Sequence, residues 1–223
     1  MHMGTSIAFD VYGTLVNPLA ISDQLKSHVG DLAAPFAELW RAKQLEYSFR
    51  RALMRAYQPF SVCTREALLY TERSLGVTLD EASRADLMRQ YRKLPPFADA
   101  APGLAALKSG GHPLAAFSNG ESNVIRGVLE NAQLWPLLDD IVSADEMKTF
   151  KPDPSLYAHA ARRLTQTGNT LWLVSSNPFD IIGAKIAGLH TAWVRRDARA
   201  VFDPWGVEPD LVVAGIDRLS ALI

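Results

Sequence analysis

Ser6-Ile7-Ala8-Phe9-Asp10-Val11-Tyr12-Gly13-Thr14 is the stretch of sequence that decides the fold. It is a short apolar run that ends at a carboxylate and continues into residues typical of a turn. A short apolar run bounded by turn residues is consistent with a strand that is buried on both faces. The stretch therefore predicts a buried strand whose carboxyl end carries Asp10 at the start of a functional loop.

The region after this strand has a different pattern. From about residue 20 to residue 92 there is almost no strand-like alternation, and apolar residues recur at helical spacing, for example over 35–57 and 64–75. Strand-like runs return only after the Pro95-Pro96 pair. We therefore expect residues 18–95 to form a helical cap domain that interrupts the core.

Beyond residue 96, strand-like and helix-like segments alternate. The apolar runs that predict strands are 113–117, 140–142, 171–174, 191–194 and 211–213. The segments with helical spacing are 103–108, 123–132, 155–165 and 178–187. This alternation is typical of a doubly wound parallel sheet. The fold class is therefore α/β, with a Rossmann-like core of residues 1–17 plus 96–223 and an inserted helical cap domain.

Composition narrows the possible classes of function. The chain has 223 residues, with 23 Lys and Arg against 24 Asp and Glu, a formal charge of −1. This near-balance argues against a nucleic-acid-binding face or a polybasic membrane patch. The single cysteine, Cys63, excludes an internal disulfide framework. No apolar run approaches the roughly 18–20 residues of a membrane span, and no signal-peptide pattern precedes the first strand. We expect a soluble cytoplasmic protein that binds neither nucleic acid nor membrane.

Polar residues follow three of the expected strands. They are Asp10, then Ser118-Asn119, then Ser175-Ser176-Asn177. Ligands of open α/β sheets bind beyond the carboxyl ends of the strands, so these residues are expected to meet in one cleft roofed by the cap. Lys151, in the loop before the helix at 155–165, is placed to join them. A carboxylate such as Asp10 can act as a nucleophile that forms an ester with its substrate, and a lysine can neutralise and orient it.

Each of these residues also has a purely structural interpretation. Asp10 fits an Asx turn, and Ser118 and Ser175 fit helix caps. Asp180 lies near a helix start, where the helix dipole favours a carboxylate in any case. Lys151 fits a solvated loop lysine, and Arg41 fits a surface position of a helix. The sequence also lacks a G-x-S-x-G elbow, a P-loop and any metal-ligand spacing among its five histidines.

Four segments, taken together, resemble the four motifs of the haloacid dehalogenase superfamily. They are FDVYGTL at 9–15, SNG at 118–120, KP at 151–152 and VSSNPFD at 174–180. The segment WRAKQLEY at 40–47 is similar to the cap of the L-2-haloacid dehalogenase branch (type II). Each motif alone is weak, but their order spans the core from end to end.

Two positions separate this branch from the phosphatases of the superfamily. The phosphatase motifs carry a second Asp where this chain has Tyr12, and a magnesium-binding Asp where it has Ser176. A phosphate dianion beside a carboxylate nucleophile needs a cation to offset their repulsion, whereas a carbon centre that bears a halogen does not. The resemblance thus implies displacement at carbon with no metal and no other cofactor.

The resemblance implies a two-step hydrolysis of short (S)-2-haloalkanoic acids, and of haloacetates, to (R)-2-hydroxy acids. Asp10 attacks the carbon, halide leaves with inversion, and water then hydrolyses the aspartyl ester. Thr14 would support Asp10, and Lys151 would neutralise Asp10 and Asp180. Arg41 and Asn119 would stabilise the departing halide.

The resemblance assigns the other site residues in two groups. Ser118, with backbone N–H groups near Tyr12 and Gly13, would hold the substrate carboxylate. Water would be positioned and activated by Ser175, Asn177 and Asp180. Tyr157 would hydrogen-bond near Asp180 and Lys151. The apolar pocket would be lined by Tyr12, Leu45, Phe60 and Phe179.

Two departures from the branch pattern bear on pocket volume. Ala42 stands where a glutamine is common after the arginine, and Phe179 stands where a tryptophan is common. The partner implied is the small haloacid substrate, with a homodimer expected from the family. Two other functions stay open: a magnesium-dependent small-molecule phosphatase and a non-catalytic module that binds a small carboxylate.

Overall fold

A six-stranded parallel sheet forms the centre of the molecule. The computed structural model describes residues 5–165 and 170–223, so the first four residues of the predicted core segment lie outside the described residues. The strands are β1 (Thr5–Phe9), β2 (Leu114–Ser118), β3 (Asp140–Ser143), β4 (Thr170–Ser175), β5 (His190–Val194) and β6 (Leu211–Val213), in the order β3-β2-β1-β4-β5-β6. The predicted doubly wound parallel sheet is confirmed.

The central position of β1 explains why distant segments meet. β1 pairs with β2 on one side and with β4 on the other, and Phe9 lies level with Ala116 and Val174. The carboxyl ends of these three strands therefore lie at one edge of the sheet. The order of the strands reverses here, because β2 and β3 follow on one side of β1 and β4 to β6 on the other. The buried strand at 5–9 thus places its carboxyl end between the ends of β2 and β4.

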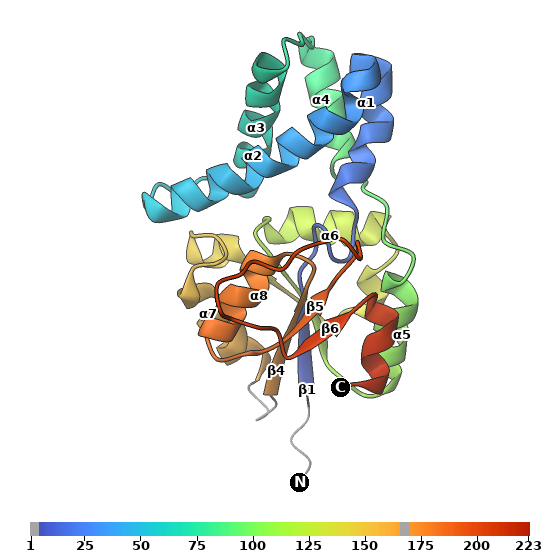
Figure 1. Cartoon of the computed structure of the whole chain (residues 1–223), viewed down its shortest axis with the longest axis vertical. Coiled ribbons are helices and arrows are strands. Elements are labelled where there is room, and N and C mark those ends of the chain that lie inside the picture. Colours follow the sequence, from blue (N-terminus) through green and yellow to red (C-terminus); the bar gives the residue numbers. More distant parts are fainter. Residues whose placement is uncertain (1–4, 166–169) are drawn as a thin grey trace.

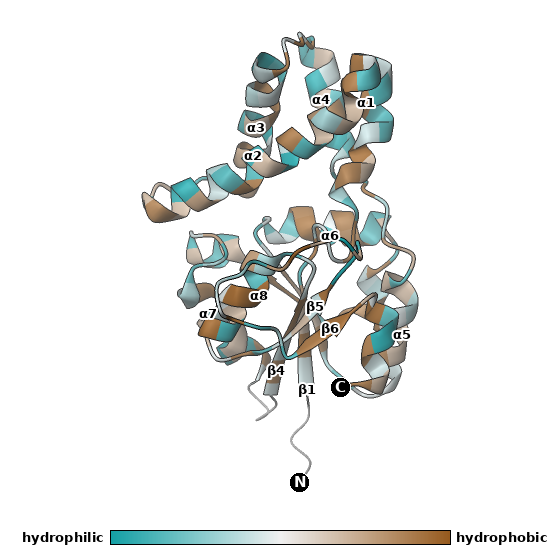
Figure 2. Cartoon of the chain, in the orientation of Figure 1, coloured by the Kyte–Doolittle hydropathy of each residue, from teal (hydrophilic) through white to brown (hydrophobic). Residues whose placement is uncertain are grey.

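Helices cover both faces of the sheet. On one side α5 (Ala100–Ser109) packs against the short helix η5 (Ile216–Ala221), and on the other α7 (Pro154–Leu164) packs against α8 (Pro178–Ile186) (Figure 1). α6 (Ser122–Asn131) joins β2 to β3. Apolar residues fill the strands and the inner helix faces (Figure 2), as expected for a sheet that is covered twice.

A group of helices lies at one end of the molecule, above the sheet (Figure 1). It contains α1 (Ser22–Val29), α2 (Ala33–Leu53), α3 (Phe60–Ser74) and α4 (Glu81–Gln90), with the short helices η1 (Pro18–Ile21) and η2 (Gly30–Leu32). The indole of Trp40 on α2 is buried and donates to the carbonyl of Thr64 on α3 at 2.8 Å. These helices are the inserted helical cap. Within the described ranges no helix is long and apolar enough to cross a membrane.

The cap is joined to the core by two chain segments that pair with each other. Asn17 N donates to the Pro95 carbonyl at 2.9 Å, and Phe97 N donates to the Leu15 carbonyl at 3.0 Å. Such pairing restricts how the cap can turn relative to the sheet. Away from the connections, Tyr57 donates to Asp145 on the short helix η4 (Ala144–Met147) at 2.6 Å.

Close packing of α5 against η5 predicts a stability difference between two helical glycines. A Cβ at Gly103 would lie 2.6–2.8 Å from Ile216 and the backbone of Asp217, whereas one at Gly127 on α6 would meet nothing within 4 Å. Gly103→Ala is expected to lower the free energy of unfolding by about 1–3 kcal/mol through overpacking. Gly127→Ala is the matched control and is expected to raise it by about 0.5–1 kcal/mol through helix propensity. Urea unfolding of both variants checks this, and equal effects would contradict the close approach.

Candidate active site

The Asp10 carboxylate lies at the carboxyl end of β1 and is held from two sides. Its Oδ2 accepts from the Thr14 hydroxyl at 2.9 Å and from Asn177 Nδ2 at 2.7 Å. The loop from Asp10 to Thr14 turns at Gly13, whose φ of +97° is unfavourable for residues with a side chain. Asp10 is only 7% exposed, so the carboxylate is both oriented and largely shielded from solvent.

The Lys151 side chain approaches this carboxylate from the interior and is buried. Its Nζ donates to the Phe117 carbonyl at 2.7 Å and to Asp180 Oδ2 at 2.8 Å, and lies 3.4 Å from Asp10 Oδ1. Burial of an unpaired ammonium group costs several kcal/mol, so the two carboxylates and the carbonyl are what keep this charge in place. The loop lysine of the sequence is therefore not solvated but joins β1, β2 and α8.

Asp180 is the deepest of the acidic groups. It is fully buried in the first turn of α8, and its Oδ1 accepts from the Tyr157 hydroxyl at 2.8 Å. Burial raises the pKa of Asp180, while Lys151 opposes this shift. Burial also raises the pKa of Tyr157, so its hydroxyl stays protonated and donates. Gly183 permits this arrangement, because a Cβ there would lie 2.6 Å from the Tyr157 hydroxyl oxygen.

The ends of β2 and β4 supply the remaining polar groups of the core. Asn119 Oδ1 accepts from the backbone N–H of Lys151 at 2.8 Å, which fixes the orientation of the Asn119 amide. Ser118 Oγ accepts from Gly120 N at 3.3 Å, and Ser175 Oγ accepts from Asn177 N at 3.1 Å. Both serines are buried at the same edge as Asp10, and each hydroxyl also contacts its own loop in the way of a local turn.

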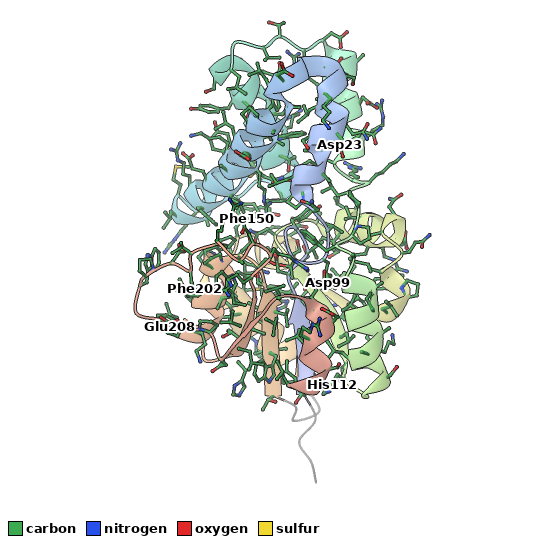
Figure 3. The ribbon with its side chains drawn as sticks, turned by 45° about the vertical axis from the view of Figure 1, so that its right-hand side comes forward. Asp23, Asp99, His112, Phe150, Phe202 and Glu208 are labelled. Carbon is green, nitrogen blue, oxygen red and sulfur yellow. The ribbon has the colours of Figure 1, made fainter. Side chains whose placement is uncertain are left out.

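Arg41 reaches the core from the cap. Its Nη2 donates to the Tyr12 carbonyl at 3.1 Å, and the same carbonyl accepts from Asn177 Nδ2 at 3.2 Å. This carbonyl therefore connects three segments: α2, the loop that follows β1 and the loop that follows β4. Figure 3 labels Phe150, which precedes Lys151, at the boundary between cap and core, with Asp23 in the cap and His112 at the far end of the core.

An apolar wall lies beside Arg41. The Tyr12 ring packs against Phe60 with centroids 6.1 Å apart and stacks on Tyr91 at 6.0 Å. A cleft between cap and core is lined by these three rings together with residues of α3, α4 and the β2 loop. Leu45 and Phe179 do not line this cleft. Both are half-buried, and Phe179 packs edge-to-face on Phe49 of α2.

The expected site residues therefore divide into two sets. Those joined by hydrogen bonds or aromatic contacts around the ends of β1, β2 and β4 are Asp10, Tyr12, Thr14, Arg41, Phe60, Ser118, Asn119, Lys151, Tyr157, Ser175, Asn177 and Asp180. The Leu45 and Phe179 side chains form no such contact with this set within the described part of the chain; Phe179 contacts Phe49 instead. Sequence reasoning missed Gln44 and Tyr91, which also contact the site. Gln44 lies three residues after Arg41, and this helical spacing is the signal that could have found it.

Tyr12 and Ser176 are the two positions at which the sequence differs from the phosphatases of the superfamily. Tyr12 is packed among aromatic rings, and the buried Ser176 Oγ has no hydrogen-bond partner within the described part of the chain. Among residues 5–165 and 170–223, no group of three or more His, Cys, Asp and Glu side chains is arranged to hold a metal ion.

Comparison with known proteins gives a consistent result. Residues 5–188 match the model of the haloacid dehalogenase-like hydrolases. The chain is 35% identical to (S)-2-haloacid dehalogenase 2 of Pseudomonas sp. (strain CBS-3), over 97% of this chain and 94% of that protein. It is 34% identical to haloacetate dehalogenase H-2 of Moraxella sp. (strain B), over 98% and 97%. Its structure is similar to that of L-2-haloacid dehalogenase from Xanthobacter autotrophicus with chloropropionic acid covalently bound, with a TM-score of 0.90, 33% identity and coverage of 99% and 98%.

The buried charge cluster predicts a pH-dependent cost of removing its cation. Lys151→Met is expected to lower the free energy of unfolding by about 3–5 kcal/mol at neutral pH, because two buried carboxylates lose their partner. Burial already raises the pKa of Asp180, so the folded state holds a proton there at pH values where the unfolded chain has released it. Stability from this group falls as pH rises through that window, and loss of Lys151 extends the window upward.

The destabilisation should therefore be larger at pH 8 than at pH 5, as measured by urea unfolding. Lys108→Met, which removes a partly exposed partner of Asp139, is the control and should cost at most about 1 kcal/mol at either pH. A Lys151→Met effect that is small and independent of pH would contradict this account of the cluster.

Proposed function

Because the chain belongs to the haloacid dehalogenase-like hydrolases, we propose that it is an (S)-2-haloacid dehalogenase. It hydrolyses the carbon–halogen bond of short (S)-2-haloalkanoic acids and haloacetates and releases (R)-2-hydroxy acids, or glycolate from haloacetates. The observation that carries the proposal is the Asp10 carboxylate, held by Thr14 and Asn177 and neutralised from below by Lys151. The names of the two relatives support the substrate class.

The first step is displacement at carbon. An Asp10 oxygen forms a bond to C2, the carbon–halogen bond breaks, and halide leaves with the electron pair of that bond. The two hydrogen bonds on Oδ2 fix the plane of the carboxylate, which favours an in-line approach. Arg41 and the Asn119 amide stabilise the charge that develops on the halogen. The product of the step is an ester between Asp10 and the acid.

The second step is hydrolysis of this ester. Water attacks the Asp10 carboxyl carbon, and one of its protons passes to Asp180. The bond from that carbon to the ester oxygen breaks, and the departing alkoxide takes the proton back from Asp180 and leaves as the hydroxy acid. The second proton of the water is released from the Asp10 carboxyl group to solvent, which restores the carboxylate. Ser175 and Asn177 position the water. Tyr157 and Lys151 hold Asp180, whose raised pKa makes it a better base than an ordinary carboxylate.

Substrate binding uses the edge of the sheet and the wall of the cap. Ser118 and the backbone N–H of Tyr12 hold the substrate carboxylate, whereas the expected contribution of Gly13 is not retained because its N–H donates to the Val16 carbonyl at 2.8 Å. Tyr12, Phe60, Leu45 and Phe179 bound the apolar space for the side chain, with the latter two at its outer edge. This wall limits the length of the substrate side chain, because Phe60 is buried against Tyr12 and cannot move aside while the cap is in place.

The proposal includes the division and assembly of the chain. Residues 18–95 form the cap and residues 1–17 plus 96–223 form the core; the pairing of residues 15–17 with 95–97 supports this division. A homodimer and a cytoplasmic location are retained as expectations of the family resemblance. Analytical ultracentrifugation tests the dimer directly.

The nucleophile predicts a specific loss of activity. The unchanged enzyme should release halide from (S)-2-chloropropionate with a metal chelator in excess. Asp10→Asn should lower this rate by more than about a thousandfold, because no ester can form. Asp23→Asn, which changes an exposed carboxylate on α1, should leave the rate unchanged. Halide release with the chelator present, by the unchanged enzyme alone, is the measurement.

A single turnover in water labelled with heavy oxygen tests the ester. With enzyme in excess, the label should enter Asp10 and not the hydroxy acid, because water attacks the carboxyl carbon. Label in the hydroxy acid would show direct attack by water on the substrate. Absence of halide release, with magnesium-dependent hydrolysis of an aryl phosphate instead, would contradict the proposed function.

The base predicts a shift in pH dependence. Hydrolysis needs Asp180 ionised, so activity is lost as pH falls through the pKa of this group. The Tyr157 hydrogen bond lowers that pKa, and its removal in Tyr157→Phe should move the acid limb of the rate profile to higher pH by about one unit. Tyr57→Phe, which loses a comparable bond to Asp145, is the matched control and should leave the limb in place. An unmoved limb in Tyr157→Phe would exclude Asp180 as the titrating group.

A further inference from the structure

A buried amide on α2 lies between Arg41 and the rest of the cap. Gln44 has no exposed surface. Its Oε1 accepts from Arg41 Nη1 at 2.6 Å and from the Tyr91 hydroxyl at 3.1 Å, and its Nε2 donates to Thr64 Oγ1 at 2.6 Å. One side chain thus connects α2, α3 and the residue that ends α4, and it does so in contact with the guanidinium group.

The orientation of this amide is set by Thr64 on one side and by the donors of Arg41 and Tyr91 on the other. The Thr64 hydroxyl donates its one proton to the Phe60 carbonyl at 2.9 Å, so toward Gln44 it presents a lone pair. The Gln44 NH2 group must therefore face Thr64, and Oε1 must face Arg41. The reverse orientation would set NH2 against the guanidinium group and the Tyr91 hydroxyl, and would leave buried donors without acceptors.

Two neutral acceptors then fix the guanidinium group. Arg41 Nη1 is bound by Gln44 and Nη2 by the Tyr12 carbonyl, so the plane of the group cannot rotate freely. Neither acceptor carries a formal charge. The positive charge of Arg41 is consequently oriented without being neutralised, as an arginine that receives an anion requires.

We propose that Gln44, oriented by Thr64 and Tyr91, is a positioning residue that directs Arg41 toward the departing halide. The inference rests on the proposed function, because the role of Arg41 is part of it. It adds that the chemistry on the core side depends on a hydroxyl of α3 that touches no reacting atom. Loss of that hydroxyl leaves the Gln44 NH2 group without its acceptor, so the amide and Arg41 are held less firmly.

Two buried threonines on α3 provide a matched test. Thr64 and Thr71 both donate to the carbonyl four residues earlier, at 2.9 and 2.8 Å, but only Thr64 also contacts Gln44. Thr64→Val and Thr71→Val each lose an equivalent helix hydrogen bond, and each replaces a buried hydroxyl by a methyl group. A difference between them therefore reports the link to Gln44.

The readout is kcat/KM for (S)-2-chloropropionate and (S)-2-bromopropionate, which reports ester formation. Chloride holds its developing charge in a smaller volume than bromide and depends more on the guanidinium group. Thr64→Val should lower kcat/KM for the chloro acid by about tenfold and for the bromo acid by less, so the bromo-to-chloro ratio rises. Gln44→Glu, whose carboxylate neutralises Arg41, should raise the ratio further. Thr71→Val and Thr64→Ser should keep the ratio of the unchanged enzyme.

Thermal unfolding of each variant separates positioning from stability. If Thr64→Val lowers both substrates equally, or no more than Thr71→Val, the inference is overturned while the proposed function stands. If the unchanged enzyme releases no halide from either acid, the proposed function itself fails. Should Thr64→Val not fold, Tyr91→Phe removes the second donor to Gln44 Oε1 and is judged by the same ratio.

Discussion

The ammonium group of Lys151 is the interaction on which the rest of the structure depends. It is buried, and its ligands come from the ends of β1 and β2 and from the first turn of α8. A buried cation needs close acceptors, so those three elements cannot separate without a large cost in free energy. The same constraint orients Asp10 and keeps Asp180 beside it, although burial works against the ionised form of Asp180.

Backbone groups as well as side chains form the contacts between cap and core. The Tyr12 carbonyl accepts from Arg41 of the cap and from Asn177 of the core, and the Tyr12 ring packs on Phe60 and Tyr91. Ser61, at the start of α3, donates from its hydroxyl and its backbone N–H to Glu121 in the loop after β2. The carboxylate thus binds at the positive end of that helix. The site is therefore built jointly by cap and core in this arrangement.

Much of the fold could be predicted from the sequence because its signals are local. The apolar run at 6–9 is strand β1, and each later strand lies within a residue or two of its apolar run. The meeting of Asp10, Asn119 and Asn177 follows from parallel topology, since the ends of adjacent strands share an edge. The burial of Lys151 could not be predicted in this way. A loop lysine before a proline carries no local sign of the two carboxylates that will surround it.

The cap network was harder to predict for the same reason. Tyr91 lies 47 residues from Gln44, and no periodicity links them. Gln44 could be placed near Arg41 from helical spacing, but the direction of its amide depends on Thr64, which lies on another helix. Tertiary hydrogen bonds of this kind are specified by packing, and local pattern gives no access to them.

The balance of charge in the site bears on the kind of substrate it suits. Asp10 and Asp180 bring two negative charges, and Lys151 and Arg41 bring two positive ones, so the groups offset each other. A haloacid enters with a single negative charge on a carboxylate, remote from the carbon that reacts, and that carbon is neutral. A phosphate dianion would instead place two charges on the reacting group, directly against Asp10. Two positions could hold further acids that would recruit a compensating cation.

These positions carry Tyr12, which is held among aromatic rings, and Ser176, whose hydroxyl is buried. The balance of charge therefore favours attack by one carboxylate on a neutral carbon. The leaving anion would be stabilised by Arg41, whose hydrogen-bond acceptors carry no formal charge.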